Sequence, residues 1–185
     1  MNKEWNHPLE KIVKSVTYKG ISYDIVERPD VLWVGCLNYA DNNHEESDSD
    51  TTLSRFRNLL GVEKRELVNP AWSAAIWVNY GCDDKPCGIM FAQETYSDFQ
   101  DGRYEVIKQP AGLWLRLRRS KETSLALFGG ESIDAWDYFA CGEMPKAAEA
   151  NGYIVNPDVS LWIGYDCHEE YAAPPHTCYA YLPIV

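Results

Sequence analysis

The sequence contains the same pattern twice, at a spacing of about 81 residues. The segment YDIVERPDVLWV, which begins at Tyr23, is echoed by YEVIKQPAGLWL, which begins at Tyr104, with tyrosine, proline, leucine and tryptophan at matching places. The segment IWVNYG, from Ile76, is echoed by LWIGYD, from Leu161. A repeat of this length is one structural unit used twice, so it constrains the fold more than any single motif. The join between two such units is also a place where ligand sites form.

Each copy of the repeat is typical of a strand, a helix and two further strands. Runs rich in β-branched and aromatic residues, bounded by turn residues, predict strands at 22–39, 71–80 and 87–95 and again at 103–119, 159–165 and 177–184. Pro29 and Pro110 interrupt the first strand of each half, as proline does at a turn or a bulge.

Apolar residues at helical spacing predict one main helix in each half. The first helix surrounds Leu53, Phe56 and Leu59, and the second surrounds Ile133, Trp136 and Phe139, each 80 residues later. Pro145 either ends the second helix or opens a short one that reaches Ala150.

The first 20 residues stand outside the repeat. Their apolar positions follow helical spacing, so residues 1–20 are predicted to form an arm or a short helix; these positions are Trp5, Leu9, Ile12 and Val13. The rest of the chain, 21–185, is predicted to form one domain built from two repeats, about 21–100 and 101–185.

The charge of the chain limits its partners. The formal net charge is −11, which argues against direct nucleic-acid binding and against anionic membrane surfaces, and permits cationic or neutral partners. No run is long enough for a membrane helix, and the first residues lack the apolar segment of a signal peptide. We therefore expect a cytoplasmic protein with six reduced cysteines and no DNA-binding module of its own.

Motifs for cofactors and for catalysis are missing from the sequence. No two of the four histidines, His7, His44, His168 and His176, have a spacing suited to a metal. The sequence has no glycine-rich phosphate loop and no nucleophile elbow. We therefore expect no cofactor and no metal.

Four local signatures in order resemble those of one known family. They are IVERPDVLWVG from Ile25, VIKQPAGLWLRL from Val106, the pair Ala135-Trp136, and the ending YAYLPIV from Tyr179. Together these segments resemble the GyrI-like or AraC-type effector-binding domain of bacterial transcription regulators, including integron-associated members. The resemblance covers about residues 20–185 and implies an α+β fold, in which a duplicated strand–helix–strand–strand unit forms a twisted antiparallel sheet with two main helices on one face. It also implies a cleft between the halves and a small lipophilic ligand, often cationic.

The sequence departs from that family at one important position. The family commonly has a buried glutamate in the next-to-last strand, and the matching residue here is Trp162, whose counterpart in the first half is Trp77. A tryptophan supplies no charge, but two of them can hold a flat apolar ligand between their rings. Asn79 is expected on the same strand face as Trp77, and Tyr80 and Tyr165 are expected at a polar rim. The alternative is that these rings are ordinary core and strand residues.

Three functions are compatible with these features. The first is a stand-alone protein that binds a lipophilic or aromatic, drug-like molecule in the cleft and that is linked to transcription regulation or drug sensing through a separate chain. The second is a hydrolase of reactive cyclopropane-type compounds, for which Glu94 is a weak candidate for the acid that activates water. The alternative prediction for Glu94 is a solvent-facing residue of the strand. The third is a structural or interaction module whose cleft is filled.

Overall fold

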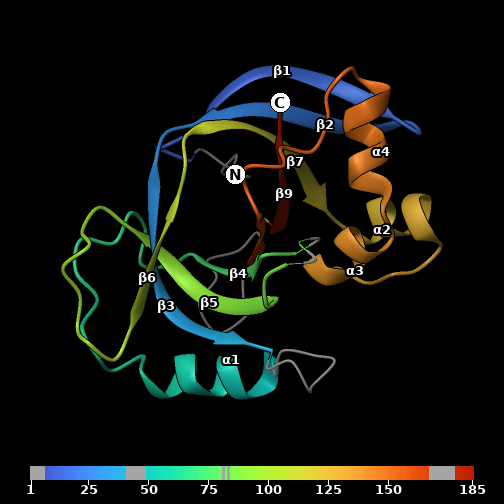
Figure 1. Cartoon of the computed structure of the whole chain (residues 1–185). Coiled ribbons are helices and arrows are strands. Elements are labelled where there is room, and N and C mark those ends of the chain that lie inside the picture. Colours follow the sequence, from blue (N-terminus) through green and yellow to red (C-terminus); the bar gives the residue numbers. More distant parts are fainter. Residues whose placement is uncertain (1–6, 41–48, 81, 83, 167–177) are drawn as a thin grey trace, which may run out of the picture.

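A computed structural model describes residues 7–40, 49–80, 82, 84–166 and 178–185. Its strands are β1 (Lys11–Tyr18), β2 (Ile21–Arg28), β3 (Val31–Tyr39), β4 (Ser73–Val78), β5 (Gly88–Thr95), β6 (Glu105–Gln109), β7 (Gly112–Arg119), β8 (Leu161–Asp166) and β9 (Cys178–Ile184). Its helices are α1 (Ser49–Asn58), α2 (Lys121–Phe128), α3 (Ala135–Ala140) and α4 (Glu143–Ala150). The strands form one antiparallel sheet in the order β1-β2-β7-β9-β8-β4-β5-β3-β6, which is the predicted α+β class (Figure 1).

The order of strands in the sheet is symmetric about its central pair, β8 and β4. On either side of this pair lie β9 and β5, then β7 and β3, then β2 and β6, while β1 extends one edge. Trp77 of β4 and Trp162 of β8 are direct partners in the central ladder. Two copies of one unit would produce such an order, and an ancestral duplication stays a prediction from the sequence.

The helices differ in number from the sequence prediction. The structure has α1 near the predicted place, α3 around Trp136 and Phe139, and α4, which reaches Ala150 as one of the two predictions for Pro145 has it. Helix α2 is additional. Helix α2 was missed because only Ser124 and Leu127 on it are buried, which leaves a weak apolar pattern. Pro145 lies in the first turn of α4, where its missing N–H costs no hydrogen bond.

Of the two predictions for the N-terminal segment, an arm or a short helix, the helix is wrong for residues 11–18, which form the edge strand β1. This strand pairs with β2 and has an irregularity between Ile12 and Lys14. At this irregularity the consecutive residues Ile12 and Val13 are both exposed, so the segment lacks the simple alternation of a strand. The β-branched residues of this segment favour the strand.

The sheet is buried on both faces. The helices lie on one face, where Phe56 of α1, Phe139 of α3 and Met144 of α4 belong to one apolar cluster with strand residues. Trp33 and Trp114 belong to a second apolar cluster on the opposite face. Alternate residues of the central strands therefore point into two different cores.

Within the described ranges, none of the helices is long and apolar enough to cross a membrane. The described cysteines, Cys36, Cys82, Cys87, Cys141 and Cys178, are free thiols. No three His, Cys, Asp or Glu side chains among the described residues are placed to hold a metal ion. His44, His168 and His176 lie outside the described residues.

Candidate ligand-binding pocket

The structure brings Trp77, Trp162 and Tyr80 together and adds two rings from α3. Phe139 packs edge-on against both indoles, with ring centroids 5.3 Å from Trp77 and 5.2 Å from Trp162. Trp136 stacks on Trp77 at 5.8 Å, and Tyr80 contacts Trp162 at 4.5 Å. The space between the two predicted clamp residues is therefore filled by the protein's own side chains.

The other predicted site residues lie apart from these rings. Asn79 follows β4 in a turn with φ at 59°, and its amide donates to the Pro86 carbonyl and accepts from the Ser160 hydroxyl. It therefore holds the chain at the end of the strand and does not share the strand face of Trp77. Tyr165 lies on the face of the sheet opposite Trp162, because it is three positions further along β8 and strand side chains alternate between faces.

Glu94 is not a solvent-facing residue: it is 4% exposed and forms the centre of a buried polar cluster. Its carboxylate pairs with the Arg28 guanidinium and accepts hydrogen bonds from His7 and from the Tyr165 hydroxyl. Arg28 also donates to Tyr165 at 2.9 Å and to Gln109 at 3.5 Å. The His7 Nδ1 accepts from the Leu9 N–H, which leaves the Nε2 proton for Glu94.

The charges of this cluster balance one another. Burial alone would raise the pKa of Glu94, but Arg28, His7 and Tyr165 outweigh it and hold that pKa below its ordinary value. Burial raises the pKa of Tyr165 well above its ordinary value, so the phenol stays protonated and donates. Since Glu94 faces away from Trp162 and already has three partners, the cluster fastens strands and the N-terminal segment together.

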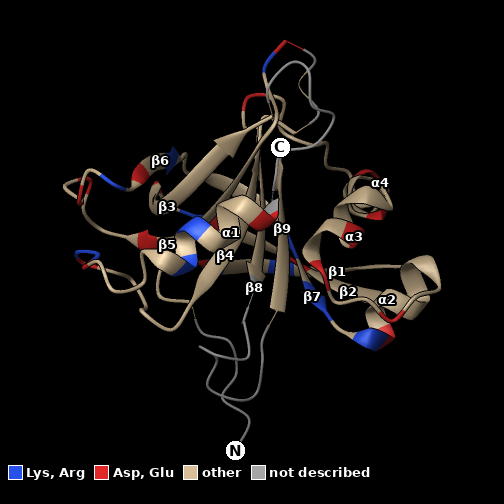
Figure 2. Cartoon of the chain, turned by 90° about the horizontal axis from the view of Figure 1, so that it is seen from below, with Lys and Arg blue, Asp and Glu red and all other residues tan. Residues whose placement is uncertain are grey.

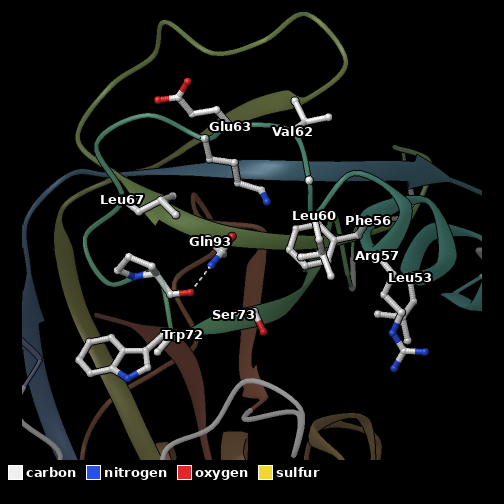
Figure 3. Close-up of a pocket in the computed structure, with 14 residues that line it drawn as sticks. Leu53, Phe56, Arg57, Leu60, Val62, Glu63, Leu67, Trp72, Ser73 and Gln93 are labelled. Atoms are coloured by element: carbon white, nitrogen blue, oxygen red, sulfur yellow. Dashed lines mark hydrogen bonds between the residues drawn. The ribbon is translucent and has the colours of Figure 1, made fainter.

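A pocket of about 490 Å³ lies beside α1, on the helix-covered face of the sheet (Figure 3). Leu53, Phe56 and Leu60 form one wall, and Leu67 and Trp72 stand across from them. The lining also includes polar residues, which are Arg57, Glu63, Lys64, Ser73 and Gln93. An apolar hollow of this size with a few polar groups is the common form of a small-molecule site.

Hydrogen bonds from other segments hold the turn that follows α1, and this turn shapes the pocket. The Tyr104 hydroxyl, from the strand-rich second half, donates to the carbonyls of Leu59 at 2.5 Å and Val62 at 3.0 Å. The Gln93 amide donates to the Pro70 carbonyl at 2.8 Å and so fixes the opposite wall. Trp72 links the pocket to the buried cluster around Glu94, since its ring also stacks on His7 with the centroids 5.4 Å apart.

None of the residues predicted as the site lines this pocket. Between the predicted first helix and the predicted strand 71–80 the sequence shows no helical or strand period, so residues 61–70 were not assigned to a site. One signal was present: Leu60, Val62, Leu67 and Trp72 place several apolar residues in a segment without regular structure. Such residues need a partner, and here they line a hollow.

Comparison with known proteins gives a likeness in fold and none in sequence. No family model matches the chain, and no curated protein matches it. A protein of Staphylococcus aureus MU50 that is assigned to transcription regulation has a TM-score of 0.58 at 10% identity, over 89% of this chain and 99% of its own. The C-terminal domain of EcmrR has a TM-score of 0.53 at 14% identity, over 88% and 96%. An integron cassette protein of Vibrio cholerae has a TM-score of 0.49 at 10% identity, over 88% and 95%. The chain thus shares its fold with the Staphylococcus aureus protein and with the C-terminal domain of EcmrR.

Proposed function

We propose that this protein binds a small lipophilic or aromatic molecule in the pocket beside α1. The observation that carries the proposal is the hollow of about 490 Å³, whose walls are mainly apolar. Such a volume falls within the range of about 300–1,000 Å³ that is typical of ligand sites. The likeness in fold to regulator-associated domains supports a role as an effector-binding protein.

Apolar burial supplies the affinity in this proposal. A two-ring ligand that removes ~200 Å² of apolar surface from water gains ~5 kcal/mol. A gain of this size corresponds to a Kd of about 0.2 mM. The loss of translational and rotational freedom offsets part of the gain, so we expect binding in the submillimolar range or weaker. A regulatory signal would pass to a separate chain through a protein contact, because a net charge of −11 disfavours direct contact with DNA.

The filled space over Trp77 and Trp162 favours a second candidate, an interaction module without a ligand. Phe139 and Trp136 occupy the space over Trp77 and Trp162, so the rings there stabilise the join of the two halves. This candidate predicts that no apolar probe binds saturably anywhere on the protein.

A titration with the neutral probe N-phenyl-1-naphthylamine separates the two candidates. We expect saturable fluorescence enhancement, and we expect Leu60→Trp to weaken it about tenfold because the larger ring fills the pocket. Leu125→Trp is the matched control, since Leu125 is an exposed leucine of α2 and does not line the pocket. No saturable binding, or equal effects of the two variants, would refute the pocket as the site.

A further inference from the structure

Lys64 is a cation on the wall of the pocket, and no anionic residue among those that the structure describes pairs with it. Its Nζ lies 4.9 Å from the ring centroid of Phe56 and 4.9 Å from that of Tyr104, and Phe56 is itself a wall residue. Its side chain makes no hydrogen bond or ion pair with any residue that the structure describes. Lys64 is half-buried, and burial lowers the pKa of its ammonium group.

A second cation lines the same pocket. Arg57 is in the last turn of α1, where Figure 2 shows that basic residues gather at one end of the helix. Its guanidinium also has no ion pair within the described part of the chain. Glu63 is the one acidic residue of the lining, and its carboxylate points away from the cavity (Figure 3). Figure 3 shows that the Arg57 guanidinium also extends outward, so Lys64 supplies the positive charge at the pocket wall, in a protein whose net charge is −11.

The ammonium group of Lys64 is held at the wall by the turn that carries it. Because Tyr104 donates to the carbonyls of Leu59 and Val62, its ring lies under the turn and beside Lys64. The aromatic faces of Phe56 and Tyr104 attract the cation but do not neutralise it. An unpaired, partly desolvated charge beside an apolar surface is suited to a ligand that combines an anionic group with an apolar body.

We propose that the ligand of this pocket is an amphipathic anion, with a carboxylate or a similar acidic group at Lys64 and an apolar body against Leu53, Leu60 and Trp72. This inference rests on the proposed function of the pocket and names the chemical class of its ligand. It differs from the cationic ligand that the family resemblance implies, because the positive charge of Lys64 would repel a cation. The acidic surface elsewhere disfavours non-specific binding of anions, so a preference for an anion must arise locally.

A pair of probes that share one ring system tests the proposal on the intact chain. 8-Anilinonaphthalene-1-sulfonate carries a sulfonate, and N-phenyl-1-naphthylamine has the same rings without it. We expect the sulfonate probe to bind at least tenfold more tightly than the neutral probe at low salt. This preference should shrink as salt screens the charges.

Variants of Lys64 assign the preference to one side chain. Lys64→Met is expected to weaken binding of the sulfonate probe about tenfold and to change the affinity for the neutral probe less than twofold. Lys64→Arg should keep the preference for the sulfonate probe. Lys11→Met, at an exposed lysine of β1 that does not line the pocket, should change neither affinity. If the neutral probe binds at the pocket but Lys64→Met weakens both probes equally, the anionic ligand is refuted and the pocket stands. If neither probe responds to Leu60→Trp, both proposals fail.

Discussion

The variant Arg28→Met is expected to lower the free energy of unfolding by about 3–5 kcal/mol. Arg28 is 1% exposed, and its guanidinium is the main positive partner of the buried Glu94 carboxylate. Methionine retains much of the apolar volume but leaves Glu94 charged and without that partner. Urea unfolding of the wild type and the variant at neutral pH measures the difference.

Two further variants separate the buried ion pair from a general effect of losing an arginine. Adding Glu94→Gln to Arg28→Met should restore part of the lost stability, because no unpaired charge then remains in the core. Arg103→Met removes an exposed arginine that pairs with Asp101, and we expect a change below about 1 kcal/mol. If Arg28→Met lowers the free energy of unfolding no more than Arg103→Met does, the buried cluster does not stabilise the fold as argued.

The pH dependence of this difference has a definite sign. Glu94 has a lowered pKa in the folded protein. Its contribution to the free energy of unfolding is therefore complete above the pKa that it has in the unfolded chain. That contribution is lost as the pH falls through the pKa that it has in the folded protein. In Arg28→Met the effect of burial dominates, so the carboxyl group takes up a proton at higher pH and the penalty is relieved. The stability gap between the two proteins should therefore narrow from about pH 7 to about pH 4. A gap that widens over this range would contradict the assignment to Glu94.

The variant Gly164→Ala is expected to destabilise the protein by about 1–3 kcal/mol and to alter the packing of the tryptophans. A Cβ atom at position 164 would lie 2.2 Å from the Cβ of Ala135, the first residue of α3. The helix must then move away from β8, and it carries the Trp136 ring that stacks on Trp77. Unfolding measurements and near-ultraviolet circular dichroism report the two effects.

Gly112→Ala is the matched control, because no atom lies within 4 Å of a Cβ at position 112 of β7. This variant should leave both the stability and the tryptophan signal close to those of the wild type. If Gly164→Ala changes the stability and the tryptophan signal no more than Gly112→Ala does, α3 does not rest directly on the sheet. The space over Trp77 and Trp162 is then not filled as described.

The order of elements could be predicted where the sequence pattern is local. The strands around Pro29 and Pro110 follow from β-branched and aromatic runs, and the facing positions of Trp77 and Trp162 follow from the repeat. Helix α2 and strand β1 could not be predicted in the same way. The first shows little apolar periodicity, and the irregularity at Ile12 and Lys14 disguises the alternation of the second.

The candidate site was harder to predict, because it depends on contacts between distant segments. Glu94 looks like a surface residue until Arg28, 66 residues away, and His7, 87 residues away, are placed against it. The pocket depends on how a segment without regular structure crosses the sheet beside α1, and no local pattern determines that path. Filling of the space over Trp77 depends on the docking of α3 at Gly164, which is likewise a long-range contact.

The most direct test is a crystal structure of the protein soaked with a bromine-labelled naphthylamine, read from its anomalous signal. The account predicts a bromine peak in the pocket beside α1, among Leu60, Trp72 and Gln93. A peak between Trp77 and Trp162 instead, or a crystal in which the probe occupies no site at concentrations well above its measured Kd, would contradict it.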